Sequence, residues 1–272
     1  MIGFANSKIN LGLNILARRK DGYHDLSTCF YPVNWCDIIE IVPLSSGKTY
    51  LKTTGLEIPP GNDENLCLKA FRLMKKDFDI PEVGIHLHKQ IPAGSGLGGG
   101  SSDASMTLRL LNTLFNIFLD DNLLAWYALK LGSDCPFFIY NKPVIAGGRG
   151  EVFEEIRIGL TGRYIYLVNP GFALSTQEAY RNLSPAAPDI SIREILEGKP
   201  AGEWKDSLSN DFEKFAFQKH PVLAEIKNKL YDAGAFYASM TGSGSGIYGI
   251  FNEDPQNLPG FPKEYITWTG VL

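Results

Sequence analysis

A run of glycines between a strand pattern and a helix pattern constrains this chain more than any other feature. Five glycines lie between Gly94 and Gly100, within the segment 91–104. Glycine has no Cβ, so backbone N–H groups in such a run can approach an anion closely. An apolar helix is expected over 104–118, and a helix N-terminus attracts phosphate through its free N–H groups and its dipole. We therefore predict a phosphate-binding loop rather than a flexible linker.

This loop matches neither of the two most familiar nucleotide-binding patterns. A Walker A loop continues into Gly-Lys-Ser/Thr, which does not follow here. Gly94, Gly96 and Gly99 fit the spacing of a dinucleotide-binding loop, but that pattern is weak without an acidic residue about 20 positions further on. Asp120 and Asp121 lie near that distance, yet their place before an apolar run is typical of helix caps.

Strand and helix patterns are mixed in both halves of the chain, which favours an α+β fold over a doubly wound parallel sheet. Alternating apolar residues predict strands over 9–15, 35–42, 83–87, 164–168, 236–240 and 247–251. Helical spacing predicts further helices over 66–74, 121–131 and 208–232. Asn62 or Asp63 is the expected cap of the first of these, and Gly132 is expected to end the second in a left-handed conformation.

Glycine and proline are concentrated over 142–150, which makes this stretch the expected junction between two domains. We expect an N-terminal domain over 1–150, which contains the glycine run. The expected C-terminal domain covers 151–272.

Composition excludes several classes of protein. The formal charge is −4, so no basic surface for nucleic acid is indicated. Neither a signal peptide at residues 1–8 nor an apolar run of membrane-spanning length is found. The four cysteines are scattered without C-x-x-C spacing, which argues against a zinc site or a disulfide framework. We expect a soluble, cytoplasmic protein that needs no nucleic acid, membrane or obligate protein partner.

Several polar side chains are candidates for a site, and each also has an ordinary structural explanation. Lys8 and Asn10 share the polar face of the first strand, but most lysines are solvated surface residues. Asp134 lies at a helix end, where a carboxylate commonly acts as a cap. His86 and His88 are spaced like two metal ligands, but no third ligand is near in sequence, so the polar face of a half-exposed strand is favoured.

A second glycine-rich segment, over 241–246, joins two apolar strands. A tight hairpin is one interpretation, since glycine-rich hairpins are common. A lid that closes on a nucleotide or substrate is the other, and the sequence leaves both open.

Taken together, these segments resemble the superfamily of galactokinase, homoserine kinase, mevalonate kinase and phosphomevalonate kinase. The resemblance covers almost the whole chain. Its motifs are Ser7-Lys8-Ile9-Asn10-Leu11, Arg19-x-Asp21-Gly22-Tyr23-His24, Lys89-x-Ile91-Pro92-x-Gly94 through Ala104, Gly132-Ser133-Asp134-Cys135-Pro136, Asn210-Asp211-Phe212-Glu213 and Met240-Thr241-Gly242-Ser243-Gly244. The glycine loop is typical of the whole superfamily. The Asp-Gly-Tyr-His segment is similar to one branch, whose acceptor is 4-diphosphocytidyl-2-C-methyl-D-erythritol.

The resemblance implies two α+β domains with the active site in the cleft between them. The N-terminal domain would resemble the second domain of ribosomal protein S5, and the C-terminal domain would be ferredoxin-like. The implied reaction is ATP-dependent phosphorylation of the 2-hydroxyl of the cytidylyl substrate, in non-mevalonate isoprenoid precursor biosynthesis.

The resemblance also implies roles for individual residues. Asp134 would be the general base that takes the proton of the acceptor hydroxyl, and Lys8 would be its electrostatic partner. The implied ATP-binding residues are Pro92, Ala93, Gly94, Ser95, Gly96, Leu97, Gly98, Gly99, Gly100, Ser101 and Ser102. The implied substrate-binding residues are Asn10, Tyr23, His24, Phe30, Thr176 and Tyr180.

ATP and Mg²⁺ are the implied cofactors, but no carboxylate is identified as a direct metal ligand. The ion is expected to be held by ATP and water, with the hydroxyl of Ser101 or Ser102. Three alternatives remain: a kinase of the same superfamily that acts on homoserine or mevalonate, a catalytically silent nucleotide sensor, and a nucleic-acid-binding module. The presence of both Lys8 and Asp134 argues against the sensor, and the acidic charge argues against the nucleic-acid module.

Overall fold

The computed structural model describes residues 1–59, 64–255, 258 and 260–272. The chain divides into two compact units, each assembled from three separate segments. Unit 1 consists of Met1–Ser7, Trp35–Ala93 and Gly98–Lys142, and unit 2 of Lys8–Asn34, Gly94–Leu97 and Pro143–Leu272. The long strands β1 (Ile2–Arg18) and β2 (His24–Pro43) pair with each other, and each contributes residues to both units.

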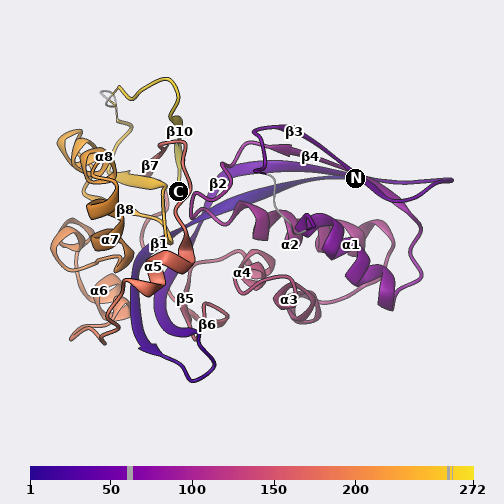
Figure 1. Ribbon diagram of the computed structural model, residues 1–272, viewed down its shortest axis with the longest axis horizontal. Helices are drawn as coiled ribbons and strands as arrows, with labels where there is room; N and C mark the ends of the chain where they lie inside the picture. The colour runs from indigo at the N-terminus through magenta and orange to yellow at the C-terminus, as the bar shows by residue number, and fades with distance from the viewer. Residues whose placement is uncertain (60–63, 256–257, 259) are drawn as a thin grey trace. The chain divides into compact units, whose positions relative to one another are not determined.

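In unit 1, strands form a sheet that is covered by helices. Strand β4 (Val83–Lys89) lies between β2, to which it is antiparallel, and β3 (Tyr50–Gly55), to which it is parallel. Figure 1 shows the helices of this unit on one side of β3 and β4. They are α1 (Leu66–Asp77), α2 (Gly99–Leu114), α3 (Asp121–Leu129) and α4 (Cys135–Tyr140).

The core of unit 1 lies between these helices and the sheet. Ile39 of β2 and Leu87 of β4 are fully buried and belong to one cluster with Met74 of α1, Leu108 of α2 and Ala128 of α3. Each element contributes the apolar face that its alternating or helical pattern predicts. The cluster therefore fixes the position of α2, the helix that follows the glycine loop.

The ends of the helices differ in detail from the sequence prediction. Asn65 caps α1 by accepting a hydrogen bond from the N–H of Cys67, and the expected caps Asn62 and Asp63 lie outside the described residues. Helix α2 begins at Gly99, five residues earlier than expected, so part of the glycine run is helical. The expected left-handed cap at Gly132 is wrong, since Gly132 is not among the residues with positive φ.

In unit 2, two short strands extend from β2 and a second sheet follows. Strand β5 (Val144–Gly147) pairs with β2 and with β6 (Val152–Glu155). The second sheet is antiparallel, in the order β10-β7-β9-β8. Its strands are β7 (Tyr164–Asn169), β8 (Tyr237–Met240), β9 (Ile247–Phe251) and β10 (Ile266–Val271). In chain order this is 4-1-3-2, the arrangement of a ferredoxin-like sheet.

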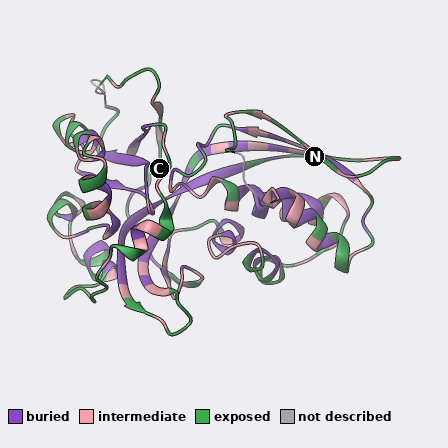
Figure 2. Cartoon of the chain, in the orientation of Figure 1, coloured by how far each residue is buried: buried purple, intermediate pink, exposed green. Residues whose placement is uncertain are grey.

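Helices fill the connection between β7 and β8. They are α5 (Thr176–Arg181), α6 (Ile192–Gly198), the 3₁₀ helix η1 (Ala201–Asp206), α7 (Phe212–Lys219) and α8 (Val222–Asp232). Helix α8 packs against β8 and β9, and these strands are buried along their length (Figure 2). The mixed, two-sheet α+β prediction is confirmed.

The single helix expected over 208–232 is wrong. Residue 220 adopts an extended φ of −134°, and α8 starts only after Pro221. A proline clashes with the backbone of the residue before it and lacks an N–H group, so it ends one helix and can start another. Residues 208–211, the start of the expected helix, are also not helical and precede α7.

The compact units do not follow a single boundary along the chain. A boundary between units falls between Lys142 and Pro143, inside the stretch 142–150 that the sequence marks as a junction. However, residues 8–34 and Gly94–Leu97 pack with the C-terminal part. The division into domains over 1–150 and 151–272 therefore stays a prediction.

Other expectations concern particular side chains. His86 and His88 both contact the Oγ1 of Thr54, at 2.9 and 3.0 Å, across the paired strands β3 and β4. All four cysteines lie within the described residues and are free of disulfides. None of the helices in the described ranges combines the length and the hydropathy that a membrane span requires.

A buried lysine between two carboxylates connects the sheet of unit 1 to the start of α2. The Nζ of Lys89 donates to Asp37 and, at 2.8 Å, to Asp103. Asp37 also accepts the backbone N–H groups of Gln90 and Ile91, at 2.6 and 2.9 Å. The chain entering the glycine loop and the helix leaving it are thus held by one charged cluster.

The Asp103 carboxyl accepts fewer hydrogen bonds than the Asp37 carboxyl. Its Oδ1 is buried and has no hydrogen-bond partner among the described residues. Burial raises the pKa of Asp103 to about 7, and the neighbouring Asp37 carboxylate acts in the same direction. Near neutral pH the folded protein therefore binds a proton at Asp103 that the unfolded chain does not bind.

We predict that Asp103→Asn changes the pH dependence of stability. The raised pKa contributes stability that is complete at low pH and is lost as the pH rises through about 7. Asparagine does not titrate, so the variant should gain stability relative to the wild type as the pH rises from about 4 to about 7, and the difference should level off above that. Urea unfolding of both proteins across this range measures the difference. A difference that stays constant with pH would contradict the assignment.

Candidate active site

Three consecutive carbonyl groups of the glycine loop are held by hydrogen bonds within unit 2. The carbonyl of Ser95 accepts the N–H of Gly246 at 3.0 Å. The carbonyl of Gly96 accepts the hydroxyl of Thr241 at 3.1 Å. The carbonyl of Leu97 accepts the N–H of Lys8 at 2.9 Å. This side of the loop is therefore occupied by β1 and by the segment 241–246.

The opposite side of the same peptide groups presents N–H groups. In a trans peptide the N–H points away from the carbonyl of the same peptide plane. The N–H groups of Gly96, Leu97 and Gly98 therefore point away from the partners that hold the three carbonyls. Successive N–H groups in such a loop form an anion-binding concavity. This geometry fits the phosphate-binding prediction.

Left-handed backbone conformations make the loop possible. Gly94, Gly96 and Gly98 have φ of 66°, 78° and 74°. A Cβ on Gly96 would lie 2.0 Å from the carbonyl oxygen of Thr241. Both the dihedral angle and the close approach therefore require glycine at position 96.

The second half of the loop is the N-terminus of α2. Gly98 occupies the N-cap position without a capping side chain. Gly100 is exposed and Ser101 is half-buried, whereas Ser102 is 2% exposed. The first turn of α2 thus offers a helix N-terminus and one accessible hydroxyl to an anion. Earlier in the loop, Pro92 is buried and Ala93 is exposed.

The segment that carries Asp134 is tied to α2 within unit 1. The hydroxyl of Ser105 lies 2.9 Å from the carbonyl of Ser101 and 2.7 Å from the carbonyl of Cys135. Asp134 is half-buried and precedes α4, but its side chain makes no capping hydrogen bond. The ordinary explanation of this carboxylate as a helix cap is therefore wrong.

Cys135, next to this carboxylate, is not a candidate nucleophile. Burial raises the pKa of the Cys135 thiol to about 12. The thiolate is the reactive form of cysteine, so a thiol with this pKa is inert near neutral pH.

Lys8 is buried rather than solvated. Its side chain is 3% exposed, and its Nζ donates to Asn10 Oδ1 at 2.6 Å. The same Nζ lies 4.8 Å from the centre of the Phe30 ring. Asn10 in turn donates to the hydroxyl of Thr28 at 2.9 Å. The structure thus brings together one predicted catalytic residue and two predicted substrate-binding residues.

Two further aromatic contacts involve predicted substrate-binding residues of unit 2. The rings of His24 and Tyr180 are stacked, with centres 4.8 Å apart and an angle of 19° between their planes. Tyr23 is 56% exposed, and the Arg149 guanidinium lies 4.6 Å from its ring centre. An exposed ring with a cationic neighbour can stack on a base.

The segment 241–246 connects β8 and β9 as the hairpin prediction requires. It is also fixed to the glycine loop through Ser95 and Gly96, as described above. Ser243 lies 2.8 Å from Thr176 through their hydroxyl groups. Its role as a lid stays a prediction.

Some residues that contribute to this arrangement were not predicted from the sequence. They are Thr28, Ser105, Arg149 and Thr241. Of these four, Thr241 could have been identified from the sequence, because it is the first residue of the glycine-rich segment 241–246. Among the described residues, no group of three His, Cys, Asp or Glu side chains is placed to hold a metal ion.

Comparison with known proteins identifies the family. The sequence pattern described as "GHMP kinases N terminal domain" matches residues 65–142, and "GHMP kinases C terminal" matches residues 192–258. A Bacteroides fragilis protein named 4-diphosphocytidyl-2-C-methyl-D-erythritol kinase is 47% identical over 256 residues, which cover 93% of each chain. A Porphyromonas gingivalis protein of the same name is 43% identical over 273 residues and the full length of both chains.

Solved structures agree with the sequence comparison. A crystal structure of 4-(cytidine 5'-diphospho)-2C-methyl-D-erythritol kinase matches with a TM-score of 0.77 and 34% identity, over 92% of this chain and 90% of that one. Mevalonate kinase of Methanococcus jannaschii shares the fold alone, with a TM-score of 0.70 and 18% identity over 94% and 92% of the two chains. This chain therefore belongs to the GHMP kinases and, within them, to the 4-diphosphocytidyl-2-C-methyl-D-erythritol kinase family.

Proposed function

We propose that this protein transfers the γ-phosphoryl group of ATP to the 2-hydroxyl of 4-diphosphocytidyl-2-C-methyl-D-erythritol, a step of non-mevalonate isoprenoid precursor biosynthesis. The observation that supports the kinase chemistry is the glycine loop, in which three consecutive carbonyls accept hydrogen bonds from β1 and from the segment 241–246. The acceptor is supported by the names of relatives that match over nearly the whole chain.

The loop binds the phosphates of ATP through its backbone. The N–H groups of Gly96, Leu97 and Gly98 face away from the atoms that hold the loop, and the N-terminus of α2 follows directly. In phosphoryl transfer the protein acts almost entirely by positioning and by stabilising charge. A loop that is already fixed needs no reorganisation when the nucleotide binds.

Asp134 is the proposed general base. Asp134 is half-buried, and a positioned carboxylate can accept the proton of an acceptor hydroxyl. Lys8 is the proposed electrostatic partner. Its ammonium group is buried and held by the oxygen of Asn10, so it supplies a positive charge with a fixed position to the transferred phosphoryl group.

The proposed substrate site uses the side chains of unit 2. Tyr23 and His24 recognise the cytosine, with Phe30 and Tyr180 as their aromatic neighbours. Asn10 and Thr176 supply polar groups. The stacked pair of His24 and Tyr180 supports this role, because a flat, rigid surface matches a base ring.

Mg²⁺ is proposed to enter with ATP. Mg²⁺ keeps several waters and is usually held by substrate phosphates with few protein ligands. It supplies positive charge to the phosphates. Of the two candidate hydroxyls, Ser101 is half-buried and Ser102 is buried, so we assign the contact to Ser101. A cytoplasmic location without an obligate partner completes the proposal.

A coupled assay of ATP consumption tests the function directly. The cytidylyl substrate, mevalonate and homoserine are offered separately at equal concentrations. We expect turnover with the cytidylyl substrate alone. Turnover with mevalonate or homoserine instead would assign the chain to a different activity of the superfamily.

We predict that Asp134→Asn nearly abolishes turnover and leaves ATP affinity within a few-fold. The amide keeps the shape of the side chain but cannot accept the proton, a role worth roughly 10²–10⁴ in rate. Single-turnover rates and calorimetric ATP binding separate the two effects. Ser133→Ala is the neighbouring control and should keep normal rates. Near-normal turnover in Asp134→Asn would remove the general-base role.

We predict that Gly98→Val weakens ATP binding much more than the matched variant Gly162→Val. Both glycines have positive φ, so valine strains the backbone at each by about 1–3 kcal/mol. A Cβ on Gly162 would meet no atom within 4 Å. Melting temperatures and ATP dissociation constants of both variants make the comparison. Equal losses of ATP affinity would favour a purely structural role for the loop.

We predict that Tyr23→Ala raises the KM for the cytidylyl substrate and leaves the KM for ATP almost unchanged. Stacking of a base on an aromatic ring is worth about 1–3 kcal/mol, which corresponds to roughly five- to 150-fold in affinity. The control is Tyr50→Ala, because Tyr50 is 55% exposed and lies on β3 of unit 1. Inhibition by CMP gives a second readout. An unchanged inhibition constant in folded Tyr23→Ala would contradict cytosine stacking.

A further inference from the structure

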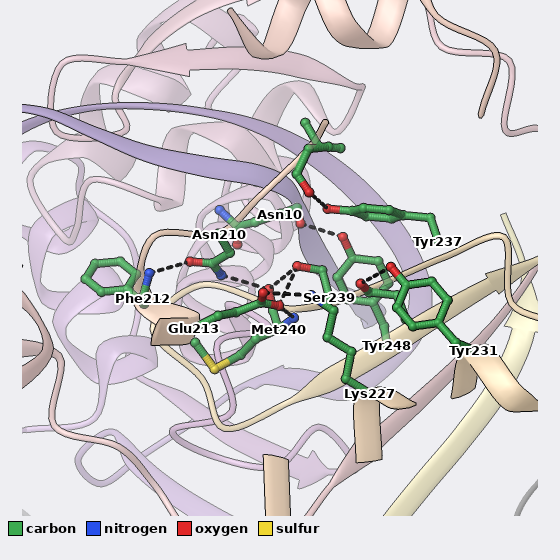
Figure 3. Close-up of polar contacts among 12 residues, drawn as sticks. Asn10, Asn210, Phe212, Glu213, Lys227, Tyr231, Tyr237, Ser239, Met240 and Tyr248 are labelled. Carbon is green, nitrogen blue, oxygen red and sulfur yellow. Dashed lines mark hydrogen bonds and ion pairs between the residues drawn. The ribbon is translucent and has the colours of Figure 1, made fainter. Parts of the chain in front are cut away.

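The residues 210–213 have no role in the proposed function, although many polar contacts of unit 2 converge on them (Figure 3). Asn210 is 2% exposed. Its Nδ2 donates to the carbonyls of Met240 and Gly242, at 2.8 and 2.9 Å, and its Oδ1 accepts the N–H of Phe212 at 3.0 Å. One hydrogen of the amide is therefore donated to the last residue of β8 and the other to the segment that follows the strand.

The two carbonyls that Asn210 binds lie on either side of Thr241. The hydroxyl of Thr241 holds the carbonyl of Gly96 in the glycine loop and accepts the N–H of Asn10 at 3.2 Å. The Met240 carbonyl belongs to the peptide group that precedes Thr241, and the Gly242 carbonyl belongs to the peptide group that follows Gly242, so the two hydrogen bonds hold the backbone at both ends of Thr241–Gly242. The Asn210 amide thus determines where the Thr241 hydroxyl lies.

Glu213 binds the end of β8, directly before Thr241. Its Oε1 accepts the N–H of Met240 at 2.8 Å and the hydroxyl of Ser239 at 3.0 Å. Its Oε2 accepts from Lys227 Nζ at 2.7 Å. Met240 therefore has both its N–H and its carbonyl bound by the residues 210–213, as Figure 3 shows.

Asp211 extends the arrangement to β1. Its Oδ2 accepts the N–H of Ile15 at 2.7 Å, and its own N–H donates to the carbonyl of Leu13 at 2.9 Å. The strand β1 also carries Lys8, whose N–H holds the carbonyl of Leu97. The residues 210–213 thus contact both elements of unit 2 that hold the glycine loop.

We propose that Asn210 is a positioning residue for nucleotide binding: it fixes Thr241, and Thr241 fixes the glycine loop. This inference rests on the proposed function, because it assumes that the loop binds ATP. Asn210 itself is not assigned a contact with either substrate. Its reach to Gly242 is the informative feature. If Asn210 only held β8 in its sheet, a hydrogen bond to the strand would be enough. Its second bond goes to Gly242, which lies outside β8, in the connecting segment.

The test compares Asn210→Ala and Thr241→Val with the wild type. Thr241→Val removes the hydroxyl and keeps the shape, so it tests the same link if Asn210→Ala folds poorly. We expect the KM for ATP to rise about tenfold or more in both variants, since small displacements of a positioned group can cost up to about a hundredfold. The melting temperature of each variant is measured alongside, so that activity is compared per folded protein.

Tyr231→Phe is the matched control. Its hydroxyl donates to the carbonyl of Ala238 at 3.1 Å, on the same strand β8 but two residues before Met240. The variant removes one hydrogen bond to β8 and leaves the segment 241–246 in place. We expect its KM for ATP to stay within about twofold of the wild type, even if its melting temperature falls. A rise in KM equal to that of Asn210→Ala would overturn the proposal.

The double variant Asn210→Ala/Thr241→Val shows whether Asn210 acts through Thr241. We expect its KM for ATP to equal that of the weaker-binding single variant. All three variants lose the same connection, from Asn210 through Thr241 to the glycine loop, so the effects should not add. A KM equal to the product of the two separate effects would overturn the proposed route. A folded Asn210→Ala with a normal KM would overturn the positioning role itself.

The wild type separates this inference from the proposed function. If it does not phosphorylate the cytidylyl substrate but binds ATP in calorimetry, the proposed function is wrong. The same variants, compared by their ATP dissociation constants, then still decide the role of Asn210. A wild type that binds no ATP would overturn both.

Discussion

The hydrogen bonds behind the glycine loop are the constraint on which the rest of the site depends. Each of three consecutive carbonyls is bound by a different partner, from β1 or from the segment 241–246. A loop with five glycines would otherwise lose much conformational entropy when a nucleotide orders it. Folding of unit 2 orders residues 95–97 in advance. The proposed phosphate binding therefore depends on the contacts of β1 and of the β8–β9 hairpin as well as on the glycines.

Two buried lysines show how the chain keeps charge in place near this loop. Lys8 is held by a neutral amide oxygen, whereas Lys89 lies between two carboxylates. An ammonium group already paired with carboxylates contributes little net charge to a ligand, and a buried ion pair is often only weakly stabilising. Lys89 therefore acts on the loop through structure. Lys8 donates to the amide oxygen of Asn10, and this bond fixes the position of its ammonium group.

The sequence predicted the parts of the fold that depend on local pattern. The glycine loop between strand and helix, the β8–β9 hairpin and the α+β class follow from spacing and from glycine chemistry, and all are found. The single helix over 208–232 failed because Pro221 outweighs an otherwise helical pattern. The burial of Lys8 and the contacts of Asn210 could not be predicted. The partners of Asn210 include backbone carbonyls about 30 residues away, and a backbone carbonyl leaves no trace in the sequence.

The glycine loop and the proposed acceptor site place different demands on the sequence. Phosphate binding by backbone N–H groups needs glycines at left-handed positions and a fixed loop, but few particular side chains. A mevalonate kinase at 18% identity shares the fold, with a TM-score of 0.70. The proposed recognition of the acceptor uses side chains such as Tyr23 and His24, neither of which holds a carbonyl of the loop. Substitutions at Asn210 or Thr241 should therefore weaken the phosphorylation of any acceptor. Substitutions at Tyr23 should weaken only the phosphorylation of a cytidylyl acceptor.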